Sequence, residues 1–278
     1  MTWHRRGEFA QKTKGVEMIG YRQFGAIAAM ALLGACATTS KAPAPLPPVT
    51  VEAVGLISPS LPFPKGFLPI AALPDSLALL PPPPAPGTAA MEADQEAFRE
   101  GVAASPERFA LATSDADLHW PHVVSSYEQV VGFSLSDGSK PNTEMLLRRS
   151  LTDGAASTGK AKANYKRVRP FVQNKVPSCT PADEAALSKD GSYPSGHTAI
   201  GWMLALVLTD LVPEKTDAIL KRGYEFGDSR IVCRVHWKSD TVAGRVMASA
   251  TFARLQSDPV FQAQRELARA EIAKQTAR

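Results

Sequence analysis

The fold is decided by residues 198–211, TAIGWMLALVLTDL, in which apolar side chains would fall on every side of a helix. A helix that is apolar all round needs neighbours on all sides, so this stretch is expected to be the central buried helix of the domain. With 44% hydrophobic and 21% charged residues, the chain of 278 residues has enough apolar side chains to surround it.

The segments around this helix also have helical spacing, because apolar residues recur at intervals of three and four from Met91 onward. Helices are expected over residues 217–227, 241–255 and 259–277, the last with a solvated charged face over residues 266–278. No period-two stretch of strand length stands out. The sequence therefore predicts an all-α fold, a compact multi-helix bundle around the central apolar helix.

The residues that lead into the central helix, GSYPSGH at 191–197, have the composition of an anion site. Free backbone N–H groups at a helix start, a glycine that admits close approach and a serine hydroxyl can together hold an anion. His197 would then lie beside the bound group. The alternative is a serine-capped helix with a structural histidine.

Two further clusters lie on either side. Downstream, Ser229-Arg230 precede His236 and Asp240, and a carboxylate four residues after a histidine can accept its Nδ1–H within one helical turn, leaving the Nε2 lone pair free. That pair could be the orienting group and nucleophile of a triad, or an ordinary exposed His–Asp pair.

Upstream, Lys162 and Arg169 are seven residues apart, close to two helical turns, so on one helix they would share a face. Pro170 disfavours helical geometry at Arg169 and places its guanidinium at a helix end. The alternative is a pair of solvated cations.

The order and gaps of the three clusters, 23 residues from Pro170 to Pro194 and 31 from His197 to Ser229, resemble the tripartite signature of the type 2 phosphatidic acid phosphatase (PAP2) superfamily. Within it, residues 191–198 and a proline-rich tract before Met91 are similar to bacterial class A non-specific acid phosphatases. The resemblance covers roughly residues 70–265, with no departure at a signature position.

This resemblance implies hydrolysis of small-molecule phosphate monoesters with broad specificity, an acidic optimum and no metal or cofactor. It implies that His236 attacks phosphorus and forms a phosphohistidine, that Asp240 holds its Nδ1–H, and that His197 is the general acid. The residues expected to bind the phosphate oxygens are Lys162, Arg169, Ser195, Gly196 and Arg230. A phosphohistidine can also pass its phosphoryl group to alcohols, as a side activity.

Other functions share this signature. Vanadium haloperoxidases would hold vanadate in the same site, and membrane lipid phosphatases carry several spanning helices, whereas no uncharged run here approaches twenty residues beyond the N-terminal segment. A non-catalytic phosphate-binding lipoprotein is the third alternative. After removal of residues 1–35, 26 basic and 25 acidic residues remain, too even a balance for a nucleic-acid-binding surface. A homo-oligomer is expected.

Residues 1–35 are expected to be a signal peptide with an apolar region at 24–35, and Met18 is an alternative start. The following Cys36 completes a lipobox-like LGAC at residues 33–36, so a lipid-anchored periplasmic protein of a Gram-negative bacterium is expected, or a soluble periplasmic one after ordinary cleavage. Residues 36–90 contain a run of prolines and are predicted to be an extended tether, with packing on the body near residues 73–80 as an option. The catalytic domain would be 91–278.

Three other features are not interpreted as catalytic or metal sites. Cys179 and Cys233 are candidates for a disulfide in an oxidising compartment, with two buried free thiols as the alternative. His119 and His122 flank Pro121, which breaks the helix their spacing would need to bind a metal. The Asp-Ala-Asp at residues 115–117 is expected to be a helix cap or turn.

Overall fold

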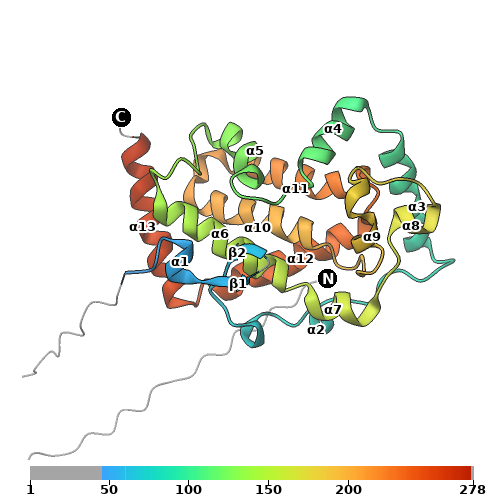
Figure 1. Ribbon diagram of the computed structural model, residues 1–278, viewed down its shortest axis with the longest axis horizontal. Coiled ribbons are helices and arrows are strands. Elements are labelled where there is room, and N and C mark those ends of the chain that lie inside the picture. The colour runs from blue at the N-terminus through green and yellow to red at the C-terminus, as the bar shows by residue number, and fades with distance from the viewer. Residues whose placement is uncertain (1–45, 60, 277–278) are drawn as a thin grey trace, which may run out of the picture. The chain divides into compact units, whose positions relative to one another are not determined.

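Helix α10 (Gly196–Leu211) lies in the middle of the computed structural model, which describes residues 46–59 and 61–276 (Figure 1). Ten of its sixteen residues are buried, and α6, α11 and α12 pack around it. The prediction of a central buried helix is confirmed. It begins two residues earlier than expected because the Ser195 Oγ accepts the Thr198 N–H at 3.2 Å and caps the first turn.

The remaining helices make the fold all-α, as predicted. They are α1 (Val51–Val54), α2 (Ser76–Leu79), α3 (Ala89–Val102), α4 (Pro106–Ser114), α5 (His122–Val131), α6 (Pro141–Ala156), α7 (Gly159–Tyr165), α8 (Pro170–Asn174), α9 (Glu184–Leu187), α11 (Thr216–Val232), α12 (Lys238–Leu255) and α13 (Pro259–Thr276). Three single turns of 3-10 helix are η1 (Ile70–Ala72), η2 (Pro181–Asp183) and η3 (Pro213–Lys215). A small antiparallel hairpin of β1 (Leu56–Ser58) and β2 (Leu61–Pro64) was not expected.

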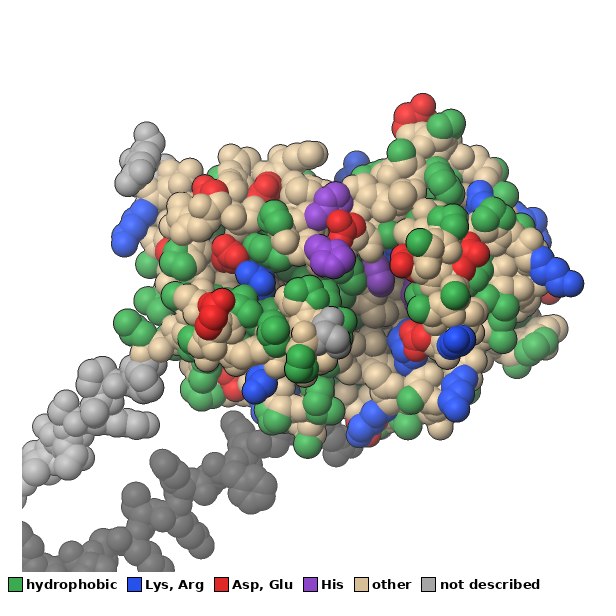
Figure 2. Space-filling view, viewed as in Figure 1, with side chains coloured by type: hydrophobic (Ala, Val, Ile, Leu, Met, Phe, Trp, Pro, Cys, Tyr) green, Lys and Arg blue, Asp and Glu red, His purple; other side chains and the backbone are tan. Residues whose placement is uncertain are grey.

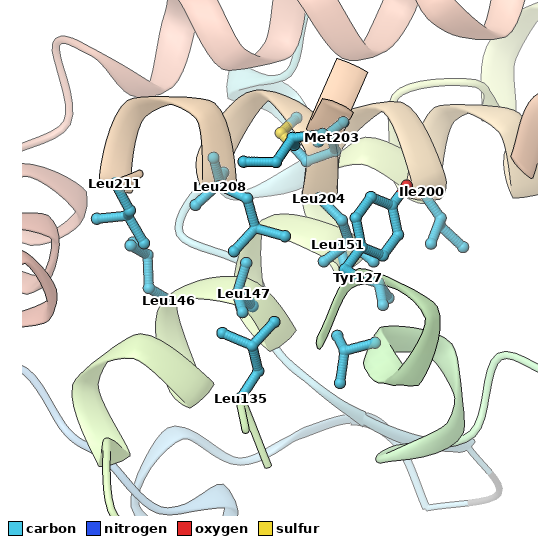
Figure 3. Close-up of a cluster of buried hydrophobic side chains, with 14 of the residues drawn as sticks. Tyr127, Leu135, Leu146, Leu147, Leu151, Ile200, Met203, Leu204, Leu208 and Leu211 are labelled. Atoms are coloured by element: carbon cyan, nitrogen blue, oxygen red, sulfur yellow. The ribbon is translucent and has the colours of Figure 1, made fainter. Parts of the chain in front are cut away.

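The main hydrophobic core lies between α10 and α6. Leu204, Leu208 and Leu211 of α10 point toward Leu146 and Leu147 of α6, and all five side chains are buried (Figure 3). Burying a leucine side chain fully contributes about 2 kcal/mol. This contact fixes the axis of α10 and therefore the position of its N-terminus.

The C-terminal helix α13 corrects the expectation of a merely solvated face over residues 266–278. Ala268 and Ile272 are buried in the core, and the Glu271 carboxylate accepts the backbone N–H groups of Asn142 at 3.0 Å and Thr143 at 2.8 Å. Those N–H groups belong to the first turn of α6, where a carboxylate is favourable. Glu271 is therefore a cap supplied by a helix more than a hundred residues away.

The proline-rich segment is not the tether that was predicted to end at residue 90. The described residues from Leu46 onward belong to the same compact unit as the helices, and Phe67, Leu68 and Leu80 are buried. The helices between residues 46 and 88 are single turns, as expected for a proline-rich segment, but proline does not prevent burial of the apolar side chains between the prolines. The folded unit therefore begins well before Met91.

Helix α6 holds this segment through side chains that bind its backbone. The Asp153 carboxylate accepts the N–H groups of Phe67 at 2.8 Å and Leu68 at 3.2 Å. Arg149 donates to the Gly66 carbonyl at 2.9 Å, and its guanidinium lies 3.9 Å from the centre of the Phe67 ring. These contacts supply the hydrogen bonds that an irregular buried segment cannot make for itself.

We expect Asp153 to make stability depend on pH. Burial raises the pKa of its carboxyl from 3.8 to about 7, against the opposing effect of the Phe67 and Leu68 N–H groups. Since the folded pKa is the higher one, its contribution is fully present below about pH 4 and is lost as pH rises to about 7. The expected loss is up to about 4 kcal/mol in the free energy of unfolding.

Denaturant unfolding of the wild type and of Asp153→Asn at several pH values measures this contribution. The difference between the two proteins isolates Asp153 from other titrating groups, and it should shift steadily in favour of the variant between about pH 4 and pH 7. A difference that stays constant over that range would contradict the assignment.

None of the helices within the described residues is long and apolar enough to cross a bilayer. The expected signal region at 24–35 and the lipidation candidate Cys36 lie outside the described residues.

Candidate active site

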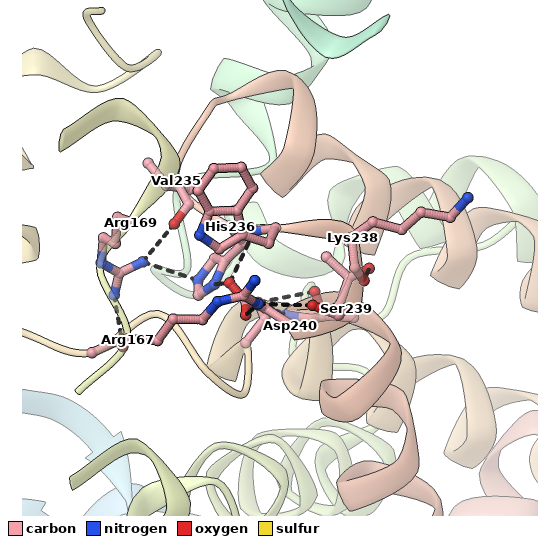
Figure 4. A network of polar contacts seen from close by, with 12 residues as sticks. Arg167, Arg169, Val235, His236, Lys238, Ser239 and Asp240 are labelled. Atoms are coloured by element: carbon pink, nitrogen blue, oxygen red, sulfur yellow. Dashed lines mark hydrogen bonds and ion pairs between the residues drawn. The ribbon is translucent and has the colours of Figure 1, made fainter. Parts of the chain in front are cut away.

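His236 and Asp240 lie where α11 gives way to α12 (Figure 4). His236 precedes the N-cap of α12, and Asp240 is in the first turn, where its Oδ2 accepts the Trp237 N–H at 2.9 Å. The same Oδ2 lies 3.4 Å from Nδ1 of His236, and the two side chains are 2% and 0% exposed. The expected His–Asp pair is therefore formed and buried. The two residues are brought together at the start of α12, and not within one turn of a continuous helix.

Sequence reasoning missed two charged residues behind this pair. Arg167 donates to Oδ1 of Asp240 at 2.6 Å and to Asp94 of α3 at 2.7 Å, and Asp94 also accepts the Ser239 N–H at 2.7 Å. All of these charges are almost fully buried. Asp240 therefore has a fixed partner on each oxygen, which holds the carboxylate beside His236. The one feature of the sequence that could have indicated a role for Arg167 is its position two residues before Arg169.

Lys162 and Arg169 both reach the site, but they do not share a helix as expected. Helix α7 ends at Tyr165, the following Lys166 has a φ of 45°, and Arg169 has the extended geometry of the N-cap of α8. Arg169 donates from Nη1 to Nε2 of His236 at 3.1 Å and to the Val235 carbonyl at 3.0 Å. Lys162 donates to the Gly191 carbonyl at 2.7 Å.

Asp190 is a further residue that the sequence did not single out. Its carboxylate lies 3.1 Å from Arg169 and 3.5 Å from Lys162, and it is 52% exposed. An anion that binds both cations has to compete with this carboxylate. No local motif marks Asp190, because its role depends on two cations brought in from other segments.

The N-terminus of α10 faces the same space. Gly196 is its first residue, and the N–H of Ser195 donates to the Asp240 carbonyl at 3.0 Å, which ties this turn to α12. Gly244 permits this approach, because a Cβ there would lie 2.5 Å from the Ser195 carbonyl oxygen. The Ser195 hydroxyl accepts hydrogen bonds from Thr198, as a cap does, and the side chain is buried.

His197 has a defined orientation. Its Nε2 lies 3.2 Å from the carbonyl oxygen of Ala116, and because a carbonyl oxygen can only accept, this assigns a hydrogen to Nε2. A second proton, when the ring is charged, is therefore on Nδ1.

Arg230 completes the cluster from α11. It is 2% exposed, and its Nε has no hydrogen-bond partner among the described residues. Its neighbour Ser229 donates to Asp115 at 2.6 Å, and Asp115 also pairs with Arg222. Asp115 is the C-cap of α4, in agreement with the expected helix cap or turn, and it is also a buried ion-pair partner.

The electrostatics of the site favour an incoming anion. Burial, then the cations Arg169, Lys162 and Arg230, lower the pKa of His236 well below 6.5. Burial is also the main cause that lowers the pKa of His197, followed by the charge of Arg230. In the same way, burial and, to a smaller extent, the charge of Arg169 lower the pKa of Lys162 to about 8 and that of Arg230 to about 9. A bound dianion stabilises cations that are desolvated in this way.

One cavity of about 780 Å³ connects these groups. Of the expected site residues, those that line it are Lys162, Arg169, Gly196, His197, Arg230 and His236. Asp240 lies behind His236, and Ser195 lies behind Gly196. Three segments that are far apart in the sequence therefore converge on one space.

Other residues considered in the sequence lie elsewhere. Cys179 and Cys233 are joined by a disulfide with a Cα–Cα distance of 4.7 Å, which ties the loop before η2 to the end of α11. His119 lies against Asp117 at 2.7 Å, and His122 against Ser114. Within residues 46–59 and 61–276, no three His, Cys, Asp or Glu side chains are grouped so that they could hold a metal ion.

Comparison with known proteins gives consistent matches. Residues 145–258 match the sequence model of the PAP2 superfamily. The chain is 45% identical over 202 residues to a non-specific acid phosphatase of Providencia stuartii, an alignment that covers 72% of this chain and 82% of the relative. It is 44% identical to an acid phosphatase of Zymomonas mobilis, over 72% of this chain and 76% of the relative. A non-specific acid phosphatase of Salmonella typhimurium is 44% identical, over 66% and 74%.

Proposed function

Since the chain belongs to the PAP2 superfamily and is an acid phosphatase, we propose that it hydrolyses phosphate monoesters through a phosphohistidine on His236, without a metal ion. The observation that supports this mechanism is that two imidazoles, of His236 and His197, line a single cavity together with the three cations named below. Lys162, Arg169 and Arg230, with the backbone N–H of Gly196, bind the phosphate oxygens. The Ser195 hydroxyl accepts hydrogen bonds from Thr198 and can still donate its own hydrogen to a phosphate oxygen, so it is kept in the proposed phosphate-binding set.

In the first step, the Nε2 lone pair of His236 forms a bond to phosphorus while the ester P–O bond breaks. The leaving oxygen takes the electron pair of that bond and the proton on Nδ1 of His197. The His236 ring becomes positively charged and keeps its Nδ1–H, and the Asp240 carboxylate stabilises that charge. Arg169, which donates to Nε2 in the free enzyme, turns its Nη1–H toward a phosphate oxygen.

In the second step, neutral His197 takes a proton from water, and the water oxygen attacks phosphorus. The N–P bond breaks and returns its electron pair to Nε2, so that phosphate leaves and both imidazoles are restored. The three cations offset the charge of the dianion in both steps, which is the main electrostatic requirement of phosphoryl transfer.

Two alternatives use the same groups. A haloperoxidase would oxidise bromide in the presence of added vanadate and peroxide, whereas for the phosphatase vanadate is an inhibitor. A non-catalytic phosphate-binding protein would lack a nucleophile or an acid, and this site contains candidates for both. If the protein oxidised bromide and released no phosphate from esters, the haloperoxidase assignment would replace the proposed phosphatase.

We expect a bell-shaped dependence of rate on pH, with its maximum on the acid side of neutrality. His236 has to be neutral, and its lowered pKa keeps it so in mild acid. A bound dianion raises the pKa of His197 and supplies the protonated acid, which is lost as pH rises. Above about pH 8, loss of the Lys162 charge raises KM as well.

The measurement is kcat and kcat/KM for p-nitrophenyl phosphate between about pH 4 and pH 9, with a chelator present throughout. A rate that only increases up to about pH 9 contradicts these roles. Loss of activity in chelator, restored by a divalent ion, contradicts metal independence.

We propose a periplasmic location, with Cys36 as the lipidation site, on the strength of the LGAC sequence at 33–36. The disulfide between Cys179 and Cys233 supports an oxidising compartment. A homo-oligomer remains a prediction.

A further inference from the structure

The phosphate-binding cluster occupies only part of the cavity. A second part is lined by the hairpin and η1, through Ile57, Leu61, Phe63, Pro69 and Ile70. These side chains belong to the segment that Asp153 and Arg149 hold against α6. We call them the apolar wall. Figure 2 shows the hollow on this face, with histidine side chains inside it and hydrophobic side chains along its edge.

The same apolar lining extends toward the cluster. Leu118 of the loop between α4 and α5, Leu151 of α6 and Ile200 of α10 also face the cavity, and Ile200 lies one turn along α10 from Gly196. A phosphate group held by His236 and its cations therefore has its ester oxygen close to an apolar surface. Because a phosphate is much smaller than about 780 Å³, most of the cavity is left for the leaving group.

The polar side chains near this lining already have partners. Thr152 donates to the Pro64 carbonyl at 2.9 Å, and Thr158 donates to the Ala155 carbonyl at 2.8 Å. Both oxygens of Asp153 accept backbone N–H groups. Lys65, which also lines the cavity, is exposed and can keep its ammonium in water. A sugar would lose hydrogen bonds with water here and find few side-chain partners in return.

We propose that the apolar wall binds the leaving group, and that the enzyme selects monoesters of apolar alcohols, with an alkyl chain or an aryl ring, over sugar phosphates. This inference rests on the proposed function. Each methylene that moves from water onto an apolar surface strengthens transition-state binding, by up to about fourfold when it is fully buried.

The test is a series of linear alkyl phosphates: ethyl, butyl and hexyl. Their leaving alcohols have nearly the same basicity, so differences in kcat/KM report binding of the chain rather than chemical reactivity. For the wild type, kcat/KM should increase by at least about tenfold from ethyl to hexyl phosphate, and glucose 6-phosphate should resemble or fall below ethyl phosphate.

Two variants and a matched control assign the effect to the apolar wall. Ile57→Ser and Ile70→Ser, at side chains 45% and 70% exposed, should each reduce the hexyl-to-ethyl ratio of kcat/KM severalfold, chiefly by lowering kcat/KM for hexyl phosphate. Leu56→Ser, on the same hairpin and 37% exposed but outside the cavity lining, should keep the wild-type ratio.

The possible outcomes distinguish failure of this inference from failure of the proposed phosphatase function on which it rests. Equal kcat/KM for ethyl and hexyl phosphate in the wild type overturns the inference alone. The same reduction in Leu56→Ser as in Ile70→Ser overturns the assignment to this wall. Hydrolysis of none of the esters overturns the proposed function itself.

Discussion

Replacing His236 by alanine should lower kcat/KM by about 10⁴-fold or more for every phosphate ester, because the group that forms the covalent bond is lost. Nε2 of His236 is the one imidazole nitrogen that Arg169 contacts inside the cavity among the described residues. The wild type should carry label from a ³²P-labelled ester when it is quenched in alkaline denaturant, in which a phosphohistidine survives. His236→Ala should carry none.

The matched control is His122→Ala. His122 lies outside the cavity and contacts Ser114, so its removal should leave both turnover and labelling unchanged. Labelling of His236→Ala at the wild-type level would mean that another residue is the nucleophile. Turnover without label in the wild type would mean that water attacks the ester directly.

Replacing His197 by alanine should affect substrates according to their leaving groups. An alkoxide needs a proton as it departs, so kcat/KM for ethyl phosphate should fall by about 10²- to 10⁴-fold. A p-nitrophenolate departs without one, so kcat/KM for p-nitrophenyl phosphate should fall by about tenfold or less. The contact of Nε2 with the Ala116 carbonyl leaves Nδ1 as the nitrogen that gives the proton.

The same variant should also show a burst. Because His197 activates the water of the second step, its loss slows hydrolysis of the phosphohistidine, and nitrophenolate should appear in a burst followed by slow turnover. His119→Ala, whose ring is 76% exposed and pairs with Asp117, is the control. Equal losses on both esters would remove His197 from the acid role.

The sequence was sufficient for features that depend on local pattern. The central helix follows from an apolar run that leaves no polar face, and the clusters around Arg169, His197 and His236 lie near helix ends, which short motifs specify. The predicted shared helix of Lys162 and Arg169 was wrong because the chain leaves α7 at Lys166 in a left-handed conformation that seven-residue spacing does not reveal.

Features that depend on distant pairing could not be predicted. Arg167 and Asp94 are 73 residues apart, and each alone has the appearance of a surface charge. The segment that carries the apolar wall was predicted to be a tether because of its proline content. Proline content indicates which backbone conformations are inaccessible, but it does not indicate whether the side chains are buried. Asp153 contacts Phe67 across 86 residues, and no periodicity within either segment indicates it.

The first residues of the folded unit are held in place by residues near its C-terminal end. Gln264 of α13 donates to the carbonyl of Pro48 at 3.1 Å across 216 residues, and the hairpin is secured by α6. A polypeptide that is synthesised from its amino end cannot form the contact between Pro48 and Gln264 until nearly the whole chain has followed. The start of the folded unit is therefore among the last parts of the molecule to be fixed during biogenesis, and nascent chains arrested before α13 should lack this contact.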